Sequence, residues 1–512
     1  MWVWPARRAR PRGFYRQPAE VTVGRPLSFA QMSVSYTYMQ FPQAGRTGGY
    51  IGVVALALAV AVVAGPGCRG GDGQRAAVET PASTEGAASG NQGNLGTRGR
   101  PNVLLVTIDT LRADHCSAYG YEVETTPVLR ELARNGVLFK RAYAPSATTA
   151  PSHAALLTSR YPRSLGILKN GHSLEKGYTT LAEVLAGRGY ATAAFVSSAP
   201  LRSHYGFSRG FEHFDDSFKR ETVSLGRNGE NIVDRRADAT VDAVRTWLDG
   251  RKAPSDGRPL FAWVHFVDPH APYHAPESFD GAWPQGTQEK IRAYDGEVRF
   301  ADRQLGRLLD AFRAAEGERG TLVVVTSDHG EGLGDHGWMW HGVNLHEELV
   351  RVPLVVSWPQ GGLPQRSYGW PVELLDVAPG ILRLLSFDVP REFEGRNMLV
   401  PRADDEPVFL QRRVYRAKAV EDKQTRGEMT AMVRNNWKYV WAPEDDGEEL
   451  YRLVSDPQEK DNLADREKAR GGRMATTLER WRRRHPVPEH PGRDAPLAAE
   501  RLRELRALGY VD

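Results

Sequence analysis

Short apolar runs recur along the middle of the chain, and stretches with helical spacing separate them. Residues 102–108, NVLLVTI, are apolar almost throughout, as expected for a strand buried on both faces of a parallel sheet. The same pattern predicts further strands at 191–196, 260–267 and 321–326. The intervening segments predict helices at 127–136, 180–187, 239–248 and 290–315. This alternation indicates an α/β fold with a mostly parallel central sheet and helices on both of its faces.

A further helix is predicted to begin within residues 147–158, ATTAPSHAALLT. Thr148 and Thr149 precede Pro151, and proline is favoured in the first turn of a helix. A helix N-terminus attracts anions, so a threonine hydroxyl here can face a phosphate or sulfate group and attack it once a metal or base removes its proton. The alternative is a simple N-cap.

Beyond residue 401 the pattern changes to short segments of mixed polarity. We predict strands at 408–416, 430–441 and 449–453, and an amphipathic helix at 474–483. Residues 101–400 are therefore interpreted as the main domain. Residues 401–512 are interpreted as a smaller α+β subdomain.

The first 68 residues predict a leader. Residues 51–65 are uncharged and apolar, but they are fewer than the about 20 residues that span a bilayer, which favours the core of a signal peptide. Residues 65–68, GPGC, resemble a bacterial lipobox, in which the cysteine, here Cys68, is lipidated. An uncleaved membrane anchor is the alternative. Because the residues before this run are too many for an ordinary signal sequence, Met32 or Met39 is favoured as the true start.

A flexible linker is predicted at residues 69–100, which are rich in Gly, Ala, Ser, Thr and Gln and nearly free of large apolar side chains. Its position directly after Cys68 suits an exported protein that a lipid holds at the bacterial membrane. We therefore expect a location in the cell envelope, facing the periplasm or the exterior.

Charge and cysteine content exclude two other classes of protein. The net charge is only +4 over 512 residues, and much of the basic excess lies before residue 50, so no basic face argues for a nucleic-acid partner. The two cysteines, Cys68 and Cys116, are too few for a disulfide scaffold of this size.

Polar side chains follow three of the predicted strands. Asp109 follows the first, Asp268-Pro269-His270 the third, and Asp328-His329 the fourth. Since ligands gather at the carboxyl ends of the strands in open α/β sheets, we expect a shared metal site there. Asp109, Asp328 and His329 offer oxygen and nitrogen ligands that suit Mg, Ca, Mn or Zn without choosing among them.

Seven motifs, in order, resemble those of the sulfatase family within the alkaline phosphatase superfamily. They are PNVLLVTIDTLRADHCSAYGY at 101–121, FAWVHFVDPHAPY at 261–273, YDGEVRFADRQLGRLL at 294–309, TSDHGEGLGDHG at 326–337, HGVNLHEELVRVPLVV at 341–356, ELYRLVSDPQEKDNLA at 449–464 and LRALGYVD at 505–512. The resemblance implies an alkaline-phosphatase-like sheet and a metal-dependent ester hydrolase or transferase. It also implies that Asp109, Asp328 and His329 bind the metal and that His270 and His341 surround the anionic head of the substrate.

The chain departs from this family at Thr110, Thr149 and His153 of the implied site, and it lacks one further element of the family. Many sulfatases have two successive aspartates where this sequence has Asp109-Thr110. With one carboxylate fewer, the site is slightly less suited to calcium. Where sulfatases carry Cys or Ser, then x-Pro-Ser-Arg, residues 149–153 read TAPSH. Threonine cannot yield the formylglycine aldehyde, so no formylglycine is expected, and His153 takes the place of the substrate-binding arginine. The Gly-Lys-Trp-His-Leu-Gly element of sulfatases is also absent.

Phosphorus-handling relatives in this superfamily use an unmodified threonine that both binds the metal and attacks phosphorus. By this resemblance Thr149 is a metal ligand and the catalytic nucleophile for a phosphate or sulfate ester. The alternatives are a true sulfatase that works without formylglycine and a non-catalytic metal-binding lipoprotein. The oligomeric state stays open.

A second metal is a further alternative, with Asp268, His270, His274 and His341 as its candidates. Structural roles are expected for the histidines at 115, 172, 204, 213, 265, 336 and 346, and Glu331 and Asp335 are expected either to support the metal ligands or to have a structural role.

Overall fold

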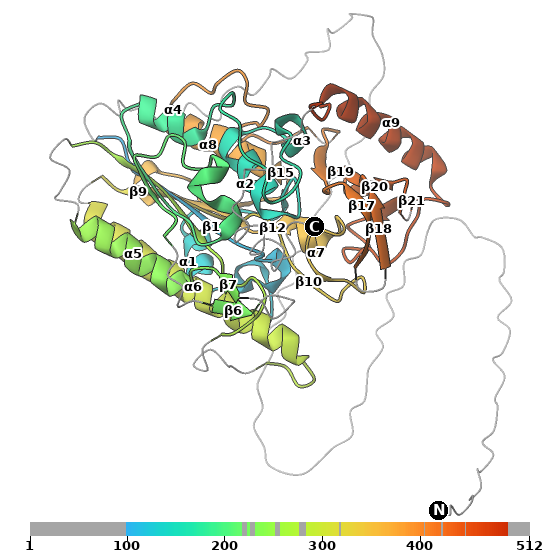
Figure 1. The fold of residues 1–512 in the computed structure, drawn as a ribbon, viewed down its shortest axis with the longest axis horizontal. Helices are drawn as coiled ribbons and strands as arrows, with labels where there is room; N and C mark the ends of the chain where they lie inside the picture. The colour runs from blue at the N-terminus through green and yellow to red at the C-terminus, as the bar shows by residue number, and fades with distance from the viewer. Residues whose placement is uncertain are drawn as a thin grey trace, which may run out of the picture. The chain divides into compact units, whose positions relative to one another are not determined.

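An eight-stranded sheet runs through the part of the chain that the structure, a computed structural model, describes (Figure 1). The described residues are 99–217, 223–225, 231–250, 257–275, 283–316, 319–403, 405–420, 423–445 and 447–489. From edge to edge the strands are β14 (Arg366–Tyr368), β2 (Val137–Phe139), β13 (Leu354–Ser357), β9 (Thr321–Ser327), β1 (Asn102–Ile108), β8 (Leu260–Phe266), β4 (Ala191–Phe195) and β5 (His213–Asp215).

The direction of these strands confirms the expected mostly parallel sheet. β1 pairs in parallel with β8 and β9, and β4 pairs in parallel with β5 and β8. Of the eight, β13 runs against its two neighbours β9 and β2. Every residue of β1, β8 and β9 is buried, which explains why each reads as an unbroken apolar run.

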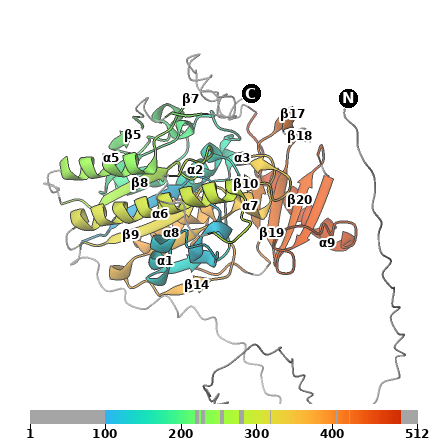
Figure 2. The same ribbon diagram turned by 90° about the horizontal axis from the view of Figure 1, so that it is seen from below.

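Helices cover both faces of this sheet, as expected. Val103 and Leu105 of β1 pack with α2 (Thr149–Thr158), α4 (Leu181–Gly187) and α8 (Val377–Leu384). Leu104 and Val106 pack on the other face with α1 (Pro127–Arg134), α5 (Ala237–Gly250) and α6 (Glu289–Glu316). Figure 2 shows α5 and α6 side by side along the sheet. Successive side chains of a strand point to opposite faces, so one strand contributes side chains to the hydrophobic cores on both faces of the sheet.

The C-terminal residues form a second sheet, β16-β19-β20-β21, whose strands pair antiparallel. Its strands are β16 (Val408–Gln411), β19 (Thr430–Arg434), β20 (Trp437–Ala442) and β21 (Gly447–Arg452), and α9 (Lys468–Arg484) packs on it. A separate hairpin pairs β17 (Tyr415–Val420) with β18 (Lys423–Gly427).

Two of the predicted C-terminal strands were wrong in extent. The strand expected at 408–416 is β16 followed by the start of β17. The strand expected at 430–441 is a hairpin, because the chain reverses at Asn435 and Asn436, whose φ angles are 50° and 62°. Positive φ at both central residues is typical of the tight turns that join antiparallel strands, and asparagine tolerates it.

Short elements join the two sheets. β10 (Gly332–Leu333) and β11 (Met339–Trp340) form a hairpin, and α7 (Glu347–Val350) follows it. Leu349 and Val350 of α7 pack with Val408 and Ala431 of the C-terminal sheet. A three-stranded sheet is formed by β12 (Arg351–Val352), β3 (Ala142–Tyr143) and β15 (Val372–Glu373). Other described elements are α3 (Pro162–Leu165) and the antiparallel pair of β6 (Val223–Leu225) and β7 (Asn231–Val233).

The predicted leader, Cys68 and most of the predicted linker lie outside the described residues. Among the described helices, none is both long and apolar enough to cross a membrane.

Candidate functional site

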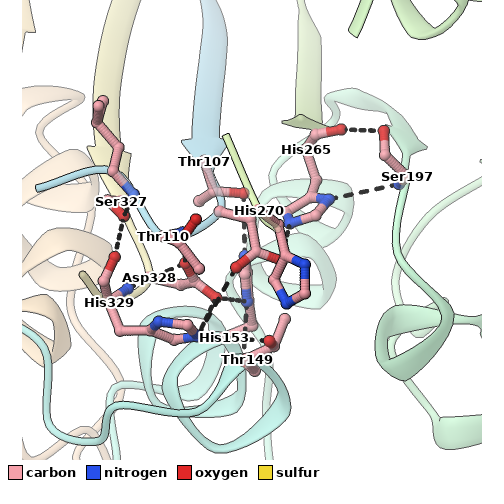
Figure 3. A network of polar contacts seen from close by, with 12 residues as sticks. Thr107, Thr110, Thr149, His153, Ser197, His265, His270, Ser327, Asp328 and His329 are labelled. Atoms are coloured by element: carbon pink, nitrogen blue, oxygen red, sulfur yellow. Dashed lines mark hydrogen bonds and ion pairs between the residues drawn. The ribbon is translucent and has the colours of Figure 1, made fainter. Parts of the chain in front are cut away.

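Three candidate metal ligands meet at the carboxyl ends of β1 and β9. The two strands pair in register with Ile108 opposite Ser327, so Asp109 and Asp328 leave the sheet side by side. One ligand atom from each of Asp109, Asp328 and His329 lies within 4.8 Å of the others, and all three side chains are fully buried. Figure 3 shows Asp328 and His329 turned toward the start of α2.

His329 presents one nitrogen to the two carboxylates. Its Nδ1 donates a hydrogen bond to the carbonyl oxygen of Gly330 at 2.9 Å, which leaves the lone pair of the neutral ring on Nε2. That atom lies 3.4 Å from Oδ2 of Asp328 and 3.7 Å from Oδ1 of Asp109. Metal-binding histidines are commonly oriented in this way, by a hydrogen bond from the other ring nitrogen.

The carboxylates of this cluster lack the hydrogen bonds that buried carboxylates normally have. Neither oxygen of Asp109, nor Oδ2 of Asp328, accepts a hydrogen bond from any described residue. Burial, together with the nearby charge of Asp328, raises the pKa of Asp109 well above its usual value. Unpaired buried carboxylates are costly, and a divalent cation would satisfy them. The residues therefore fit a bound metal.

Thr110 shapes the loop beside these ligands. Its φ of 56° is unusual for a β-branched residue, and the turn directs its N–H to Oδ1 of Asp328 at 3.3 Å. Ser327 fixes the second loop, because its hydroxyl donates to the carbonyl oxygen of His329 at 2.6 Å and accepts the N–H of Leu111 at 3.0 Å. The two loops are therefore held together by backbone as well as side-chain contacts.

Thr149 begins α2, and its hydroxyl lies in the same cluster. Its Oγ1 lies 3.4 Å from Nε2 of His329. The N-cap position belongs to Thr148, whose side chain makes no capping hydrogen bond, so capping is not what the two hydroxyls do. The helix is fixed against the metal loop because the Ser152 hydroxyl donates to the carbonyl oxygen of Asp328 at 2.6 Å.

His153 lies one turn further along α2, behind Thr149. Its Nδ1 donates to the carbonyl oxygen of Thr149 at 2.9 Å and lies 3.5 Å from Oδ2 of Asp328. Its Nε2 contacts the hydroxyl of Thr107 at 3.0 Å. The ring is fully buried, and burial lowers its pKa.

His270 and His341 form a pair at the edge of the cluster. Their Nε2 atoms lie 3.2 Å apart, and the ring centroid of His341 lies 4.4 Å from that of His329. Nδ1 of His270 donates to the carbonyl oxygen of Ala271 at 2.7 Å. Both rings are partly exposed, unlike the fully buried ligands. The pair therefore lies between the buried cluster and solvent.

A second metal bound by Asp268, His270, His274 and His341 finds no support, because these side chains do not converge as a ligand group within the described part of the chain. Asp268 instead accepts the N–H of Ala237 at 2.7 Å. Burial and the neighbouring Asp268 charge raise the pKa of Glu297 to about 8.

Sequence reasoning missed His265, for which it expected only a structural role. Its Nε2 lies 3.6 Å from Oδ2 of Asp109, its ring is fully buried, and burial lowers its pKa well below the usual value. Its Nδ1 accepts a weak hydrogen bond of 3.4 Å from the N–H of Ser197, which leaves a proton on Nε2, facing Asp109. In the sequence, the clue to this position was that His265 is the one imidazole in an otherwise apolar strand. In the structure it pairs across the sheet with Thr107.

Comparisons with known proteins identify the family to which this fold belongs. Residues 101–387 match the family model described as Sulfatase, and residues 334–482 match the model described as N-sulphoglucosamine sulphohydrolase, C-terminal. A curated relative, the choline-sulfatase of Rhizobium meliloti, is 25% identical over 455 residues, which cover 75% of this chain and 86% of the relative.

Two solved structures share the fold. One, in complex with its substrate D-glucosamine-2-N,6-O-disulfate, is 20% identical with a TM-score of 0.61, and the match covers 77% of this chain and 100% of the other. The phosphonate monoester hydrolase of Agrobacterium radiobacter is 21% identical with a TM-score of 0.60, covering 75% and 96%. Because the Sulfatase model spans more than half of its 512 residues, the chain belongs to the sulfatase family, ester hydrolases of the alkaline phosphatase superfamily.

Proposed function

We propose that this chain hydrolyses an anionic phosphate ester with Thr149 as the covalent nucleophile. Asp109, Asp328, His329 and the Thr149 hydroxyl would hold one divalent metal. The observation that carries the proposal is the position of Thr149 Oγ1, which lies 3.4 Å from the free nitrogen of His329 beside three unpaired carboxylate oxygens. A bound divalent cation lowers the pKa of a coordinated hydroxyl and offsets the charge of the ester oxygens.

Thr149 and the side chains around it would take separate roles in the reaction. Oγ1 would attack phosphorus, forming an O–P bond as the bond to the leaving oxygen breaks, and water would then release phosphate and restore the hydroxyl. The Nε2 atoms of His270 and His341 lie 3.2 Å apart at the exposed edge, where a protonated ring would donate to the anionic head or the leaving oxygen. Transfer to an alcohol in place of water follows the same first step.

His153 is proposed to position Thr149 and Asp328. The sequence suggested that it binds substrate in the place of an arginine. Both of its nitrogens contact groups of the chain, and the ring is fully buried behind the nucleophile. Contact with the substrate would require these interactions to break, so a positioning role fits the geometry better.

A sulfate ester is the second candidate, and the family match favours it. The nucleophile favours phosphorus, because a threonine cannot form the aldehyde hydrate from which formylglycine enzymes eliminate sulfate. The phosphonate monoester hydrolase shows that the same fold serves phosphorus chemistry in another protein.

The test compares purified, metal-loaded protein on an aryl phosphate monoester, an aryl phosphodiester and an aryl sulfate. We expect turnover of a phosphate ester, its loss in Thr149→Ala by a factor of about 10³ or more, and near-normal turnover in the matched control Thr148→Ala. Cleavage of the sulfate alone would replace the first candidate with the second. Full activity in Thr149→Ala would contradict the nucleophile. Metal binding without any turnover would favour a binding protein.

We also propose that Cys68 carries a lipid that tethers the protein to the bacterial membrane, facing the periplasm or exterior. The GPGC motif after an apolar run supports this proposal. Labelled palmitate should appear on the protein and vanish in Cys68→Ala, but not in Cys116→Ala, which changes a buried thiol. Retained label in Cys68→Ala would contradict it.

A further inference from the structure

We propose that His336, His346 and Glu348 form a second divalent metal site, remote in sequence from Thr149 and suited to zinc. His336 lies in the loop between β10 and β11, His346 directly precedes α7, and Glu348 lies within α7. One ligand atom from each lies within 4.8 Å of the others. The sequence had suggested only structural roles for both histidines.

His336 is oriented as a metal ligand is. Its Nε2 donates to the carbonyl oxygen of Glu459 at 3.2 Å, which directs Nδ1 toward Oε1 of Glu348 at 2.8 Å. The 2.8 Å contact is a hydrogen bond that Nδ1 donates to Glu348 while it carries a proton, and loss of that proton turns the Nδ1 lone pair toward the same position. A hydrogen bond from one ring nitrogen to a backbone carbonyl is the usual support for coordination through the other.

His346 provides the second, independent observation. It is only 9% exposed, and neither of its ring nitrogens makes a hydrogen bond of acceptable geometry to a described residue. Its ring stacks on that of His336, with centroids 3.8 Å apart and an angle of 14° between the planes. Its Nε2 lies 3.3 Å from Oε2 of Glu449. A buried ring nitrogen without a hydrogen bond, such as Nδ1 of His346 among the described residues, is costly, and coordination of the ring to a metal would satisfy it.

The charges around the cluster also favour a cation. Lys438, the nearby buried cation, is already paired with Glu347 at 3.2 Å and Glu459 at 2.9 Å. Glu348 and Glu449 face the two histidines from α7 and β21. Two imidazoles and one carboxylate are a typical zinc set, with water or Glu449 completing a tetrahedron.

An ion here would join two parts of the molecule. His336 belongs to the segment that leaves β9 through Asp328 and His329, whereas Glu449 and Glu459 belong to the C-terminal part of the chain. Asp335, next to His336, also anchors this segment through Arg112 at 2.7 Å. We therefore expect the second ion to stabilise the fold and to leave the chemistry at Thr149 to the first.

The test counts Zn²⁺ bound by full-length protein that has been stripped with a chelator and reloaded with Zn²⁺ alone. We expect two equivalents in the wild type and one in Asp328→Asn, which disables the first cluster. The double variant Asp328→Asn, His346→Gln should bind no zinc. The control double variant Asp328→Asn, His213→Gln should keep one equivalent, because His213 stacks on Trp247 outside both clusters. No zinc in Asp328→Asn, or an unchanged count on adding His346→Gln, would overturn the proposal.

A spectroscopic readout leaves the cluster unaltered and does not depend on the His346 variant folding. Co²⁺ added to stripped Asp328→Asn should give the visible bands of tetrahedral nitrogen and oxygen ligands, and Zn²⁺ should abolish them. A spectrum equal to that of aqueous Co²⁺ would contradict the site. Because Asp328→Asn already disables the first cluster, either result is independent of the proposed activity.

Discussion

At the scale of single residues, the candidate site includes side chains behind the candidate metal ligands as well as those ligands themselves. Nδ1 of His153 lies 3.5 Å from Oδ2 of Asp328, and Nε2 of His265 lies 3.6 Å from Oδ2 of Asp109. Their ring centroids lie 5.1 Å apart. Burial lowers the pKa of both rings, which favours their neutral forms, and neither ring makes a hydrogen bond to the carboxylate oxygen it faces. As neutral rings they leave the negative charge of the carboxylates available to a bound cation.

His265→Phe tests this at one residue. The change keeps an aromatic ring of similar shape and removes the N–H that faces Asp109, so we expect divalent-metal affinity to fall about 10- to 100-fold by calorimetric titration. His213→Phe is the matched control, because His213 packs on Trp247 at the far edge of the same sheet. Equal metal affinity in His265→Phe and wild type would show that the ring contributes only packing.

At the scale of elements, the sequence predicted the strands whose local pattern alone determines their structure. β1 and β9 were predicted because each is an apolar run that ends in a carboxylate, and parallel pairing then brought Asp109 and Asp328 together. His265 was missed because the register that faces it toward Asp109 depends on β8 lying beside β1, which no local pattern states. The 336–348 cluster was missed for the same reason, since its residues meet only after the hairpin and α7 fold.

The β19–β20 hairpin gives a prediction at this scale. Asn435 has a φ of 50°, which disfavours most side chains, so Asn435→Ala should lower the free energy of unfolding by about 1 kcal/mol. Asn435→Gly should be close to neutral, because glycine adopts this conformation freely. Urea unfolding of wild type and both variants measures the change in the free energy of unfolding. A loss for glycine equal to that for alanine would show that the side chain, and not the backbone angle, matters.

At the scale of the whole molecule, a buried carboxyl pair links stability to pH. Burial and the neighbouring Asp268 charge raise the pKa of Glu297 to about 8, well above its ordinary value of 4.5. The folded state therefore binds this proton more tightly than the unfolded state. Its contribution to stability is complete below the ordinary pKa and is lost as pH rises through about 8.

Glu297→Gln removes that titration and keeps a similar shape. The stability of wild type relative to Glu297→Gln should therefore fall as pH rises from about 5 to about 9. Glu289→Gln, at an exposed position of the same helix, should show no such trend. Unfolding midpoints at matched pH values measure it, and a constant difference between wild type and Glu297→Gln would refute the link.

Our proposal assigns a sulfatase-family fold a nucleophile of another kind, and the covalent intermediate tests that proposal most directly. Wild-type protein mixed with aryl phosphate, quenched in acid within one turnover and digested, should yield the peptide containing Thr149 with a phosphoryl group on that threonine. The group should be absent from Thr149→Ala and present in Thr148→Ala. Product formation in the wild type with Thr149 unmodified throughout, or with the group on another residue, would contradict the account.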